Sequence, residues 1–108
     1  MSTNKDVRVV LCTCPPEHAE RIARTMLEER LVACVNVVSG VKSLYWWKDA
    51  VQNEGESMLV IKAPSANYAK LEARLQEIHP YEVPEVLSLD VVDGLSSYIS
   101  WVKEAAHC

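Results

Sequence analysis

The sequence has 108 residues, of which 49% are hydrophobic, and a formal net charge of -4 at pH 7. This length suffices for one domain and is too short for two, so we expect a single domain over residues 1–108 with an ordered core at about 7–104. The acidic balance and the lack of a basic cluster disfavour nucleic acid and anionic membrane as partners.

The N-terminal stretch MSTNKD is polar, and no long apolar run follows it. We therefore expect no signal peptide, no transmembrane helix and a cytoplasmic location. Because the cytosol is reducing, we also expect the four cysteines to be thiols rather than a disulfide framework. Their spacing lacks the paired C-x2-4-C pattern that is typical of zinc sites; they are Cys12, Cys14, Cys34 and Cys108.

The first half of the chain predicts a strand, a helix and a long second strand. Val7–Thr13 is apolar and β-branched, which is typical of a buried strand. Pro16 suits a first helical turn, and apolar residues at helical spacing predict a helix that ends near Arg30. Leu31–Val38 predicts the second strand, and Gly40 indicates a bulge after which the strand resumes as VKSLYWWK.

The second half repeats this order. DAVQNEG, residues 49–55, predicts a loop, and Ser57–Ala63 predicts the third strand. Ser65 is the predicted N-cap of a second helix, which ends where the prolines of HPYEVPE begin. Glu85–Val91 predicts the fourth strand, and a short C-terminal helix follows.

This repeated order predicts an α+β fold of the ferredoxin-like type, with a split βαβ arrangement. We expect an antiparallel sheet with strand order 4-1-3-2 and two helices on one of its faces. The other face is then left without helices. Because its strands are apolar, we expect another surface to pack there.

The stretch SLYWWKDA, residues 43–50, places three aromatic side chains in one predicted strand. Successive side chains of a strand point to opposite faces, so adjacent tryptophans cannot both reach one core. Tyr and Trp are typical interface anchors, and a two-stranded extension alone is marginally stable. We interpret Tyr45, Trp46 and Trp47 as an interface with copies of the same chain. The alternatives are an ordinary surface tryptophan and a membrane-dipping hairpin.

Several motifs, in this order, resemble the CutA divalent-cation-tolerance family. They are VLCTCPP, EERLVACVNVV, GVKSLYWWK, HPYEVPEVLSLDV and YISWVKE, and they run from about Val7 to Glu104. The resemblance implies a ferredoxin-like fold and a homotrimer similar in architecture to the PII signalling proteins. It also implies a cytosolic protein linked to copper and other divalent cations.

The candidate metal ligands are Cys12 and His79. The predicted topology brings the end of the first strand and the end of the second helix to the same edge, and a thiolate with an imidazole suits copper or zinc. The resemblance implies the same positions, because copper binding in the family is associated with the cysteine ending the first strand and with histidine before PY. Some members carry two histidines there, whereas this chain has Ile78. Water, Glu82, Glu85 or a second chain would have to complete the site.

Each candidate also has a plain structural interpretation. Cys12 could be a core residue, and His79 a surface histidine whose ring bonds a backbone carbonyl. Cys14 precedes two prolines at a predicted helix N-terminus, where the pKa of a thiol falls, so it could be reactive or merely exposed.

An enzyme built on Cys14 and His79 would lack an identifiable orienting group and oxyanion donor, and the sequence has no nucleotide-binding fingerprint. We therefore predict a protein without enzymatic activity. The alternative function is that of a PII-like signalling or scaffold protein, which binds a small molecule or a partner protein at clefts between subunits.

Overall fold

The computed structural model describes residues 6–107. Short 3-10 helices, η1 (Pro16–His18) and η2 (Ser65–Asn67), lead into the first two α-helices. The remaining elements, in chain order, are β1 (Val7–Cys14), α1 (Ala19–Glu28), β2 (Cys34–Trp47), β3 (Ala50–Pro64), α2 (Tyr68–Ile78), β4 (Leu87–Asp90) and α3 (Ser96–Ala105).

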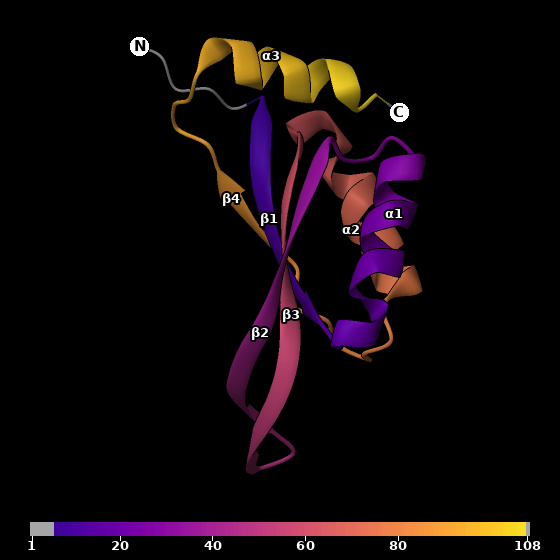
Figure 1. The fold of residues 1–108 in the computed structure, drawn as a ribbon, viewed down its shortest axis with the longest axis vertical. Coiled ribbons are helices and arrows are strands. Elements are labelled where there is room, and N and C mark those ends of the chain that lie inside the picture. Colours follow the sequence, from indigo (N-terminus) through magenta and orange to yellow (C-terminus); the bar gives the residue numbers. More distant parts are fainter. Residues whose placement is uncertain (1–5, 108) are drawn as a thin grey trace.

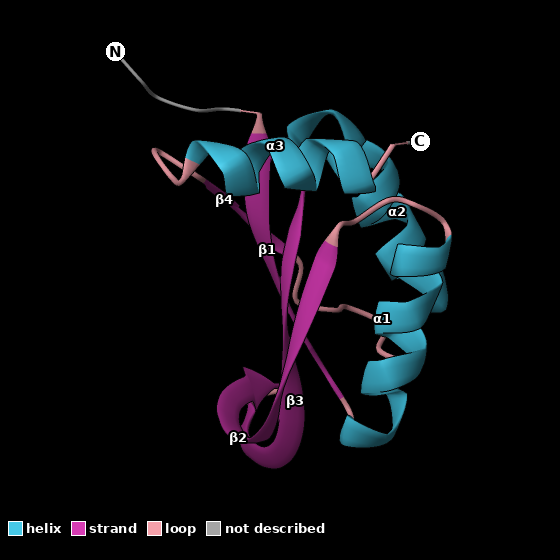
Figure 2. Cartoon of the chain, turned by 45° about the horizontal axis from the view of Figure 1, so that its top comes forward, coloured by secondary structure: helices cyan, strands magenta, loops and turns pink. Residues whose placement is uncertain are grey.

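The four strands form one sheet with the order β2-β3-β1-β4 (Figures 1 and 2). All three pairings are antiparallel. This is the predicted order 4-1-3-2 read from the other edge, and α1 and α2 lie together on one side of the sheet (Figure 1). The predicted ferredoxin-like α+β fold is confirmed.

The main core lies between the sheet and the helices α1 and α2. Val10 and Cys12 share one face of β1, because side chains along a strand alternate between the two faces. Their partners on β3, Ile61 and Leu59, are equally buried. Burying one such Leu or Ile side chain stabilises the fold by about 1.5–3 kcal/mol. The helices contribute the rest of this core, chiefly Ile22, Met26, Leu71 and Leu75.

The third helix covers one end of the opposite sheet face. Val7 points away from Val10, because strand side chains alternate, and packs against Ile99 and Val102 of α3. Figure 2 shows α3 lying across the end of the sheet where β1 begins. The expectation that no helix covers this face is therefore wrong at that end only.

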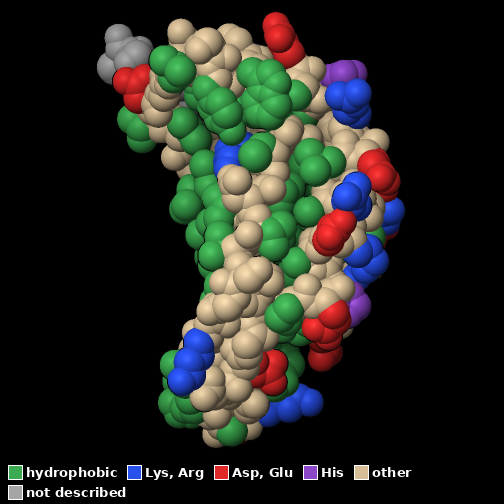
Figure 3. All heavy atoms as spheres, in the orientation of Figure 1, with side chains coloured by type: hydrophobic (Ala, Val, Ile, Leu, Met, Phe, Trp, Pro, Cys, Tyr) green, Lys and Arg blue, Asp and Glu red, His purple; other side chains and the backbone are tan. Residues whose placement is uncertain are grey.

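Beyond α3 the same sheet face is apolar and uncovered. Val9 pairs with Leu89 of β4, and Leu11 pairs with Leu87 of β4 and with Val60 of β3, so these five side chains share the face away from Val10. Leu87 is 56% exposed and Leu89 is 48% exposed. We call this surface the open face. Figure 3 shows hydrophobic side chains on the side of the sheet away from α1 and α2.

The β2–β3 hairpin is longer than the sequence predicted. Strand β2 has 14 residues and β3 has 15, and the hairpin extends past the ends of α1 and α2 (Figure 1). The predicted loop at 49–55 is wrong, because Asn53 and Gly55 pair with Leu44 and Lys42 of β2. The pairing of neighbouring strand residues overrides the turn propensity of Asn and Gly here.

Two local features shape this hairpin. The turn consists of Lys48 and Asp49 alone, both with positive φ (52° and 63°), as a type I′ turn requires. The predicted bulge is confirmed, because the β2–β3 register shifts between Val38 and Val41, and Gly40 has a φ of 74°. This register shift lies between the helix-covered part of the sheet and the extended arm.

Two predicted boundaries differ from the structure. The segment 31–33 precedes β2 rather than starting it, because Arg30 turns the chain in a left-handed conformation (φ 61°) after α1. Ser65 is not a side-chain cap. A buried side chain two residues later, Asn67, instead donates a hydrogen bond of 3.1 Å to the carbonyl of Leu31 and ties the start of α2 to that segment.

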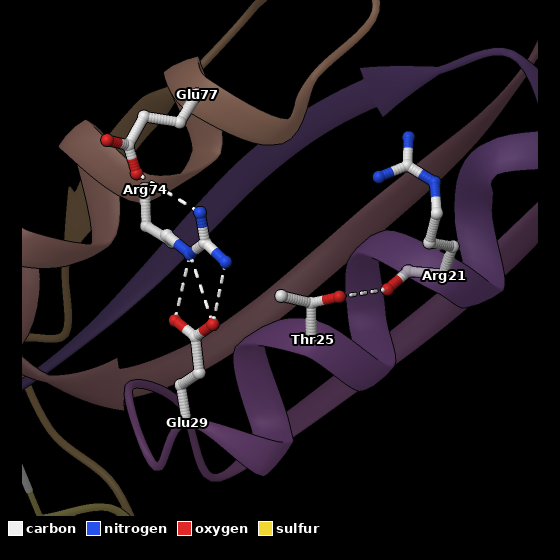
Figure 4. A network of polar contacts seen from close by, with 5 residues as sticks. All are labelled: Arg21, Thr25, Glu29, Arg74 and Glu77. Atoms are coloured by element: carbon white, nitrogen blue, oxygen red, sulfur yellow. Dashed lines mark hydrogen bonds and ion pairs between the residues drawn. The ribbon is translucent and has the colours of Figure 1, made fainter.

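The outer side of the two packed helices is polar (Figures 3 and 4). Arg74 of α2 donates to both carboxylate oxygens of Glu29, just after α1, and also to Glu77. Both partners of the Arg74–Glu29 pair are about a third exposed, so the pair contributes little to stability. The apolar surface of the molecule therefore lies on the sheet side.

The conformation of Gly40 predicts a measurable cost for a β-carbon. A Cβ at Gly40 would meet no atom within 4 Å, so Gly40→Ala is opposed only by its positive φ. We expect the free energy of unfolding to fall by about 1–2 kcal/mol in a denaturant titration. Gly55→Ala is the control, because Gly55 has equal space and an ordinary φ. Equal stabilities of the two variants would contradict this account.

Candidate functional site

His79 ends α2 and lies against the end of β1. Its backbone N–H donates to the carbonyl oxygen of Leu75, and the residue is 7% exposed. Ring atom Nε2 donates to the carbonyl oxygen of Thr13 at 2.8 Å, and Nδ1 accepts from the backbone N–H of Tyr81 at 3.1 Å. These partners fix the neutral tautomer with its proton on Nε2. Burial lowers the pKa of His79, so the ring is neutral at pH 7.

Cys12 lies beside the same carbonyl group. Its side chain is fully buried in the core between sheet and helices, and Sγ lies 3.8 Å from the Thr13 carbonyl oxygen. Burial, followed by the charges of Cys14, Glu85 and Glu56, raises the pKa of Cys12 to about 12. The thiol of Cys12 and the imidazole of His79 therefore contact one oxygen atom, as the predicted topology placed them.

The donor chemistry of this pair fits a soft metal, whereas the coordination set of one chain is incomplete. A thiolate with an imidazole suits copper or zinc. Within residues 6–107, however, no group of three or more His, Cys, Asp or Glu side chains is arranged to hold an ion. Glu82 and Glu85 line a neighbouring cleft. A metal bound by Cys12 and His79 requires further ligands from water or a second chain.

Cys14 differs from its predicted state. It is fully buried, and burial, followed by the charge of Glu56, raises the pKa of its thiol, while Arg21 acts in the opposite direction. The predicted fall of its pKa is wrong, because the side chain faces the core rather than the start of the helix. An accessible nucleophile at Cys14 is therefore not supported. Cys108 lies outside the described residues.

A cleft lies beside these residues, between the hairpin arm and the connection 80–85. Its volume is about 820 Å³. We call it the hairpin cleft. It is lined by Thr13, Ser43, Leu44, Tyr45, Trp46, Trp47, Gln52, Glu54, Glu56, Pro80, Tyr81, Glu82, Val83, Pro84 and Glu85.

A hydrogen bond between Tyr81 and Glu56 joins the two walls of the cleft. The Tyr81 hydroxyl donates to Glu56 Oε2 at 2.6 Å, and Glu56 is only 4% exposed. Burial, followed by this bond and the charge of Glu56, raises the pKa of Tyr81 above its usual range. Sequence reasoning missed Glu56; the available signal was the alternation of polar residues at 52, 54 and 56, which is typical of a strand.

The three predicted interface aromatics divide between the two faces of the arm. Tyr45 pairs with Gln52 and is 36% exposed, whereas Trp46 pairs with Val51 and is 73% exposed. Trp47, which is 39% exposed, shares the face of Tyr45. Both faces of the arm therefore leave indole surface accessible in a single chain.

Comparison with known proteins identifies the family. The sequence model of the CutA1 divalent ion tolerance protein family matches residues 8–105. The chain belongs to the CutA family. The resemblance in the five motifs is thereby confirmed.

Relatives in this family are similar over most of the chain. The divalent-cation tolerance protein CutA of Thermus thermophilus is 41% identical over 97 residues, which cover 89% of this chain and 94% of that protein. Human protein CutA is 38% identical over 102 residues, 94% of this chain and 57% of that protein.

Solved structures of CutA proteins share the fold. The Thermus thermophilus structure has a TM-score of 0.90 and covers 94% of this chain and 99% of its own. A structure described as the PII-like protein CutA from Nostoc, in apo form, is 42% identical with a TM-score of 0.89, and covers 93% of this chain and 97% of its own. Within residues 6–107 no helix is long and apolar enough to cross a membrane.

The state of Cys12 predicts slow modification. A thiol with a pKa near 12 is about a thousandfold less ionised at pH 8 than one with a pKa near 9, and Cys12 is also fully buried. We expect alkylation of Cys12 by iodoacetamide at pH 8, followed by mass spectrometry, to be at least about a hundredfold slower in the native protein than in guanidinium. Similar rates in the two states would contradict the burial described here.

Proposed function

We propose that this protein is a non-enzymatic divalent-cation-tolerance protein that binds copper, or a related cation such as zinc, through Cys12 and His79. The observation that carries this proposal is the Thr13 carbonyl oxygen, which both side chains contact. Membership of the family supports the link to divalent cations. No relative named above has a name that describes a reaction, which agrees with a role without catalysis.

Metal binding would change both side chains from their observed states. Cys12 would lose its proton, because a coordinating sulfur is a thiolate. His79 would give up either the Thr13 carbonyl or the Tyr81 N–H, since each ring nitrogen has a partner. Glu56 and Glu85 act on Cys12 as nearby negative charges, so a cation at this position would be stabilised by both. Affinity should therefore fall as the pH is lowered.

We propose that the protein assembles as a homotrimer through the open face and the hairpin arm. The open face presents Leu87 and Leu89 at about half exposure, and the arm presents Trp46 at 73%. Contiguous apolar surface of this kind is typical of interfaces. Tyr45, Trp46 and Trp47 are the proposed interface residues on the arm, and a neighbouring chain is the proposed source of the missing metal ligands.

The cytoplasm is the proposed location, supported by the free thiols of the described cysteines Cys12, Cys14 and Cys34. Relatives differ in this respect, since the rice protein is named as chloroplastic and an Archaeoglobus structure is described as periplasmic. A second candidate function is PII-like binding of a small molecule or partner. It is favoured by the hairpin cleft and by the description of the Nostoc structure as PII-like.

Copper affinity tests the proposed ligands. In a chain carrying Cys108→Ser, we expect Cys12→Ser and His79→Ala each to weaken copper binding by at least about tenfold, because each removes a direct ligand. Copper would be titrated anaerobically against a competing chelator, with zinc in parallel.

Two matched substitutions control this experiment. Cys34→Ser removes a half-buried thiol on β2, and His107→Ala removes an exposed imidazole after α3. Neither should change the affinity. If Cys12→Ser and His79→Ala bind copper as tightly as these controls, the proposed site is wrong.

Assembly is tested by placing a charge on the open face. Leu89→Lys should dissociate the trimer, because a lysine would be buried against apolar side chains of a neighbour. Leu27→Lys is the control: Leu27 is also partly exposed, at 37%, and lies on α1 on the opposite side of the sheet. Multi-angle light scattering would give both masses. A Leu89→Lys variant with the same mass as Leu27→Lys would exclude the open face as the interface.

A further inference from the structure

We propose that the ion bound by Cys12 and His79 is monovalent copper, Cu(I), rather than a divalent ion such as Cu(II) or Zn(II). This inference rests on the proposed function, because it names the oxidation state of the ion at that same site. Three properties of the two donors carry it: their burial, their number and the charge that they contribute.

The two donor side chains lie where water hardly reaches. Cys12 is 0% exposed and His79 is 7% exposed. Thr13, whose carbonyl oxygen both side chains contact, is 8% exposed. A divalent zinc ion is almost always held by four ligands, and where the protein supplies fewer, water completes the set. A position this dry therefore favours an ion that needs few ligands.

The described part of the chain offers two soft donors at this position. Within residues 6–107, no group of three or more His, Cys, Asp or Glu side chains is arranged to hold an ion. The Thr13 carbonyl oxygen is close to both donors, but an uncharged oxygen is only a weak donor to copper. Cu(I) is stable with two or three soft ligands, so it needs at most one donor beyond this pair, whereas Zn(II) needs two.

The charge of the pair also matches a monovalent ion. Cys12 would contribute one negative charge as a thiolate, and His79 would contribute none as a neutral imidazole, so the site with Cu(I) is uncharged as a whole. With a divalent ion the same site would carry one positive charge in the core, and burying a charge is costly. Glu56 and Glu85 act on Cys12 as negative charges and would offset part of that cost. A substitution at Glu85 therefore distinguishes the two kinds of ion.

X-ray absorption spectra test this proposal with both ligands in place. The intact protein, carrying only Cys108→Ser and freed of metals, would be loaded anaerobically with Cu(I) or with Zn(II). We expect two or three ligands around Cu(I), one of them sulfur and one of them nitrogen, and no sulfur ligand around Zn(II). Cu(II), added without a reductant, should give an electron paramagnetic resonance spectrum without sulfur ligation. Four ligands around Cu(I), or sulfur bound to either divalent ion, would overturn the proposal.

Affinities give a second test. Cu(I) would be titrated against bathocuproine disulfonate and Zn(II) against nitrilotriacetate. We expect Cys12→Ser and His79→Ala each to weaken Cu(I) by at least about tenfold and to leave Zn(II) within about threefold.

A charge-removing pair of variants completes this test. Glu85→Gln should leave Cu(I) within about threefold, because no carboxylate is needed to balance a monovalent ion. Glu28→Gln, an exposed glutamate on α1, is the control for the loss of one negative charge. A Glu85→Gln variant that loses as much Cu(I) affinity as His79→Ala would overturn the proposal.

The outcomes separate this inference from the proposed function. If Cys12→Ser and His79→Ala weaken Zn(II) as strongly as Cu(I), or more strongly, the proposed site stands and the preference for Cu(I) is wrong. If they weaken neither ion, the proposed site itself is wrong. Should Cys12→Ser fail to fold, as judged by thermal unfolding, Cys12→Ala takes its place, and the absorption spectra decide without any substitution of a ligand.

Discussion

The antiparallel pairing of β2 with β3 is the constraint on which the rest of the structure depends. The pairing runs from Cys34, opposite Lys62, to Trp47, opposite Ala50. The same two strands therefore form part of the sheet that packs against α1 and α2 and continue beyond these helices as the arm. A two-stranded arm of this length has no helix to cover it (Figure 1). The arm forms one wall of the hairpin cleft. Its exposed indoles and the open face are the two apolar surfaces that we propose are covered by further chains.

A second constraint operates at the end of β1. The Thr13 carbonyl oxygen accepts the His79 ring N–H and also lies beside the Cys12 thiol. This contact fixes the connection after α2, and Tyr81 is held in turn by Nδ1 of His79. Tyr81 then reaches Glu56 across the cleft. The proposed metal ligands and the hairpin cleft are thus neighbours built on one connection.

Hydrophobic periodicity was sufficient to predict the strand order, the two packed helices and the meeting of the end of β1 with His79. Turn propensity gave the wrong prediction at 49–55, because Asn53 and Gly55 are held in β3 by their partners on β2. The rule that a helix N-terminus lowers the pKa of a thiol gave the wrong prediction for Cys14, because its thiol is buried although it precedes two prolines. The cleft could not be predicted, because Glu56 and Tyr81 meet only through tertiary packing.

The central claim is that the open face and the hairpin arm are covered by identical chains. Sedimentation equilibrium of the unmodified protein, from micromolar to nanomolar concentration, tests this most directly. The account predicts a mass three times that of the 12.1 kDa chain, held throughout the dilution because large apolar surfaces are buried. A folded species with the mass of one chain at micromolar concentration would contradict it.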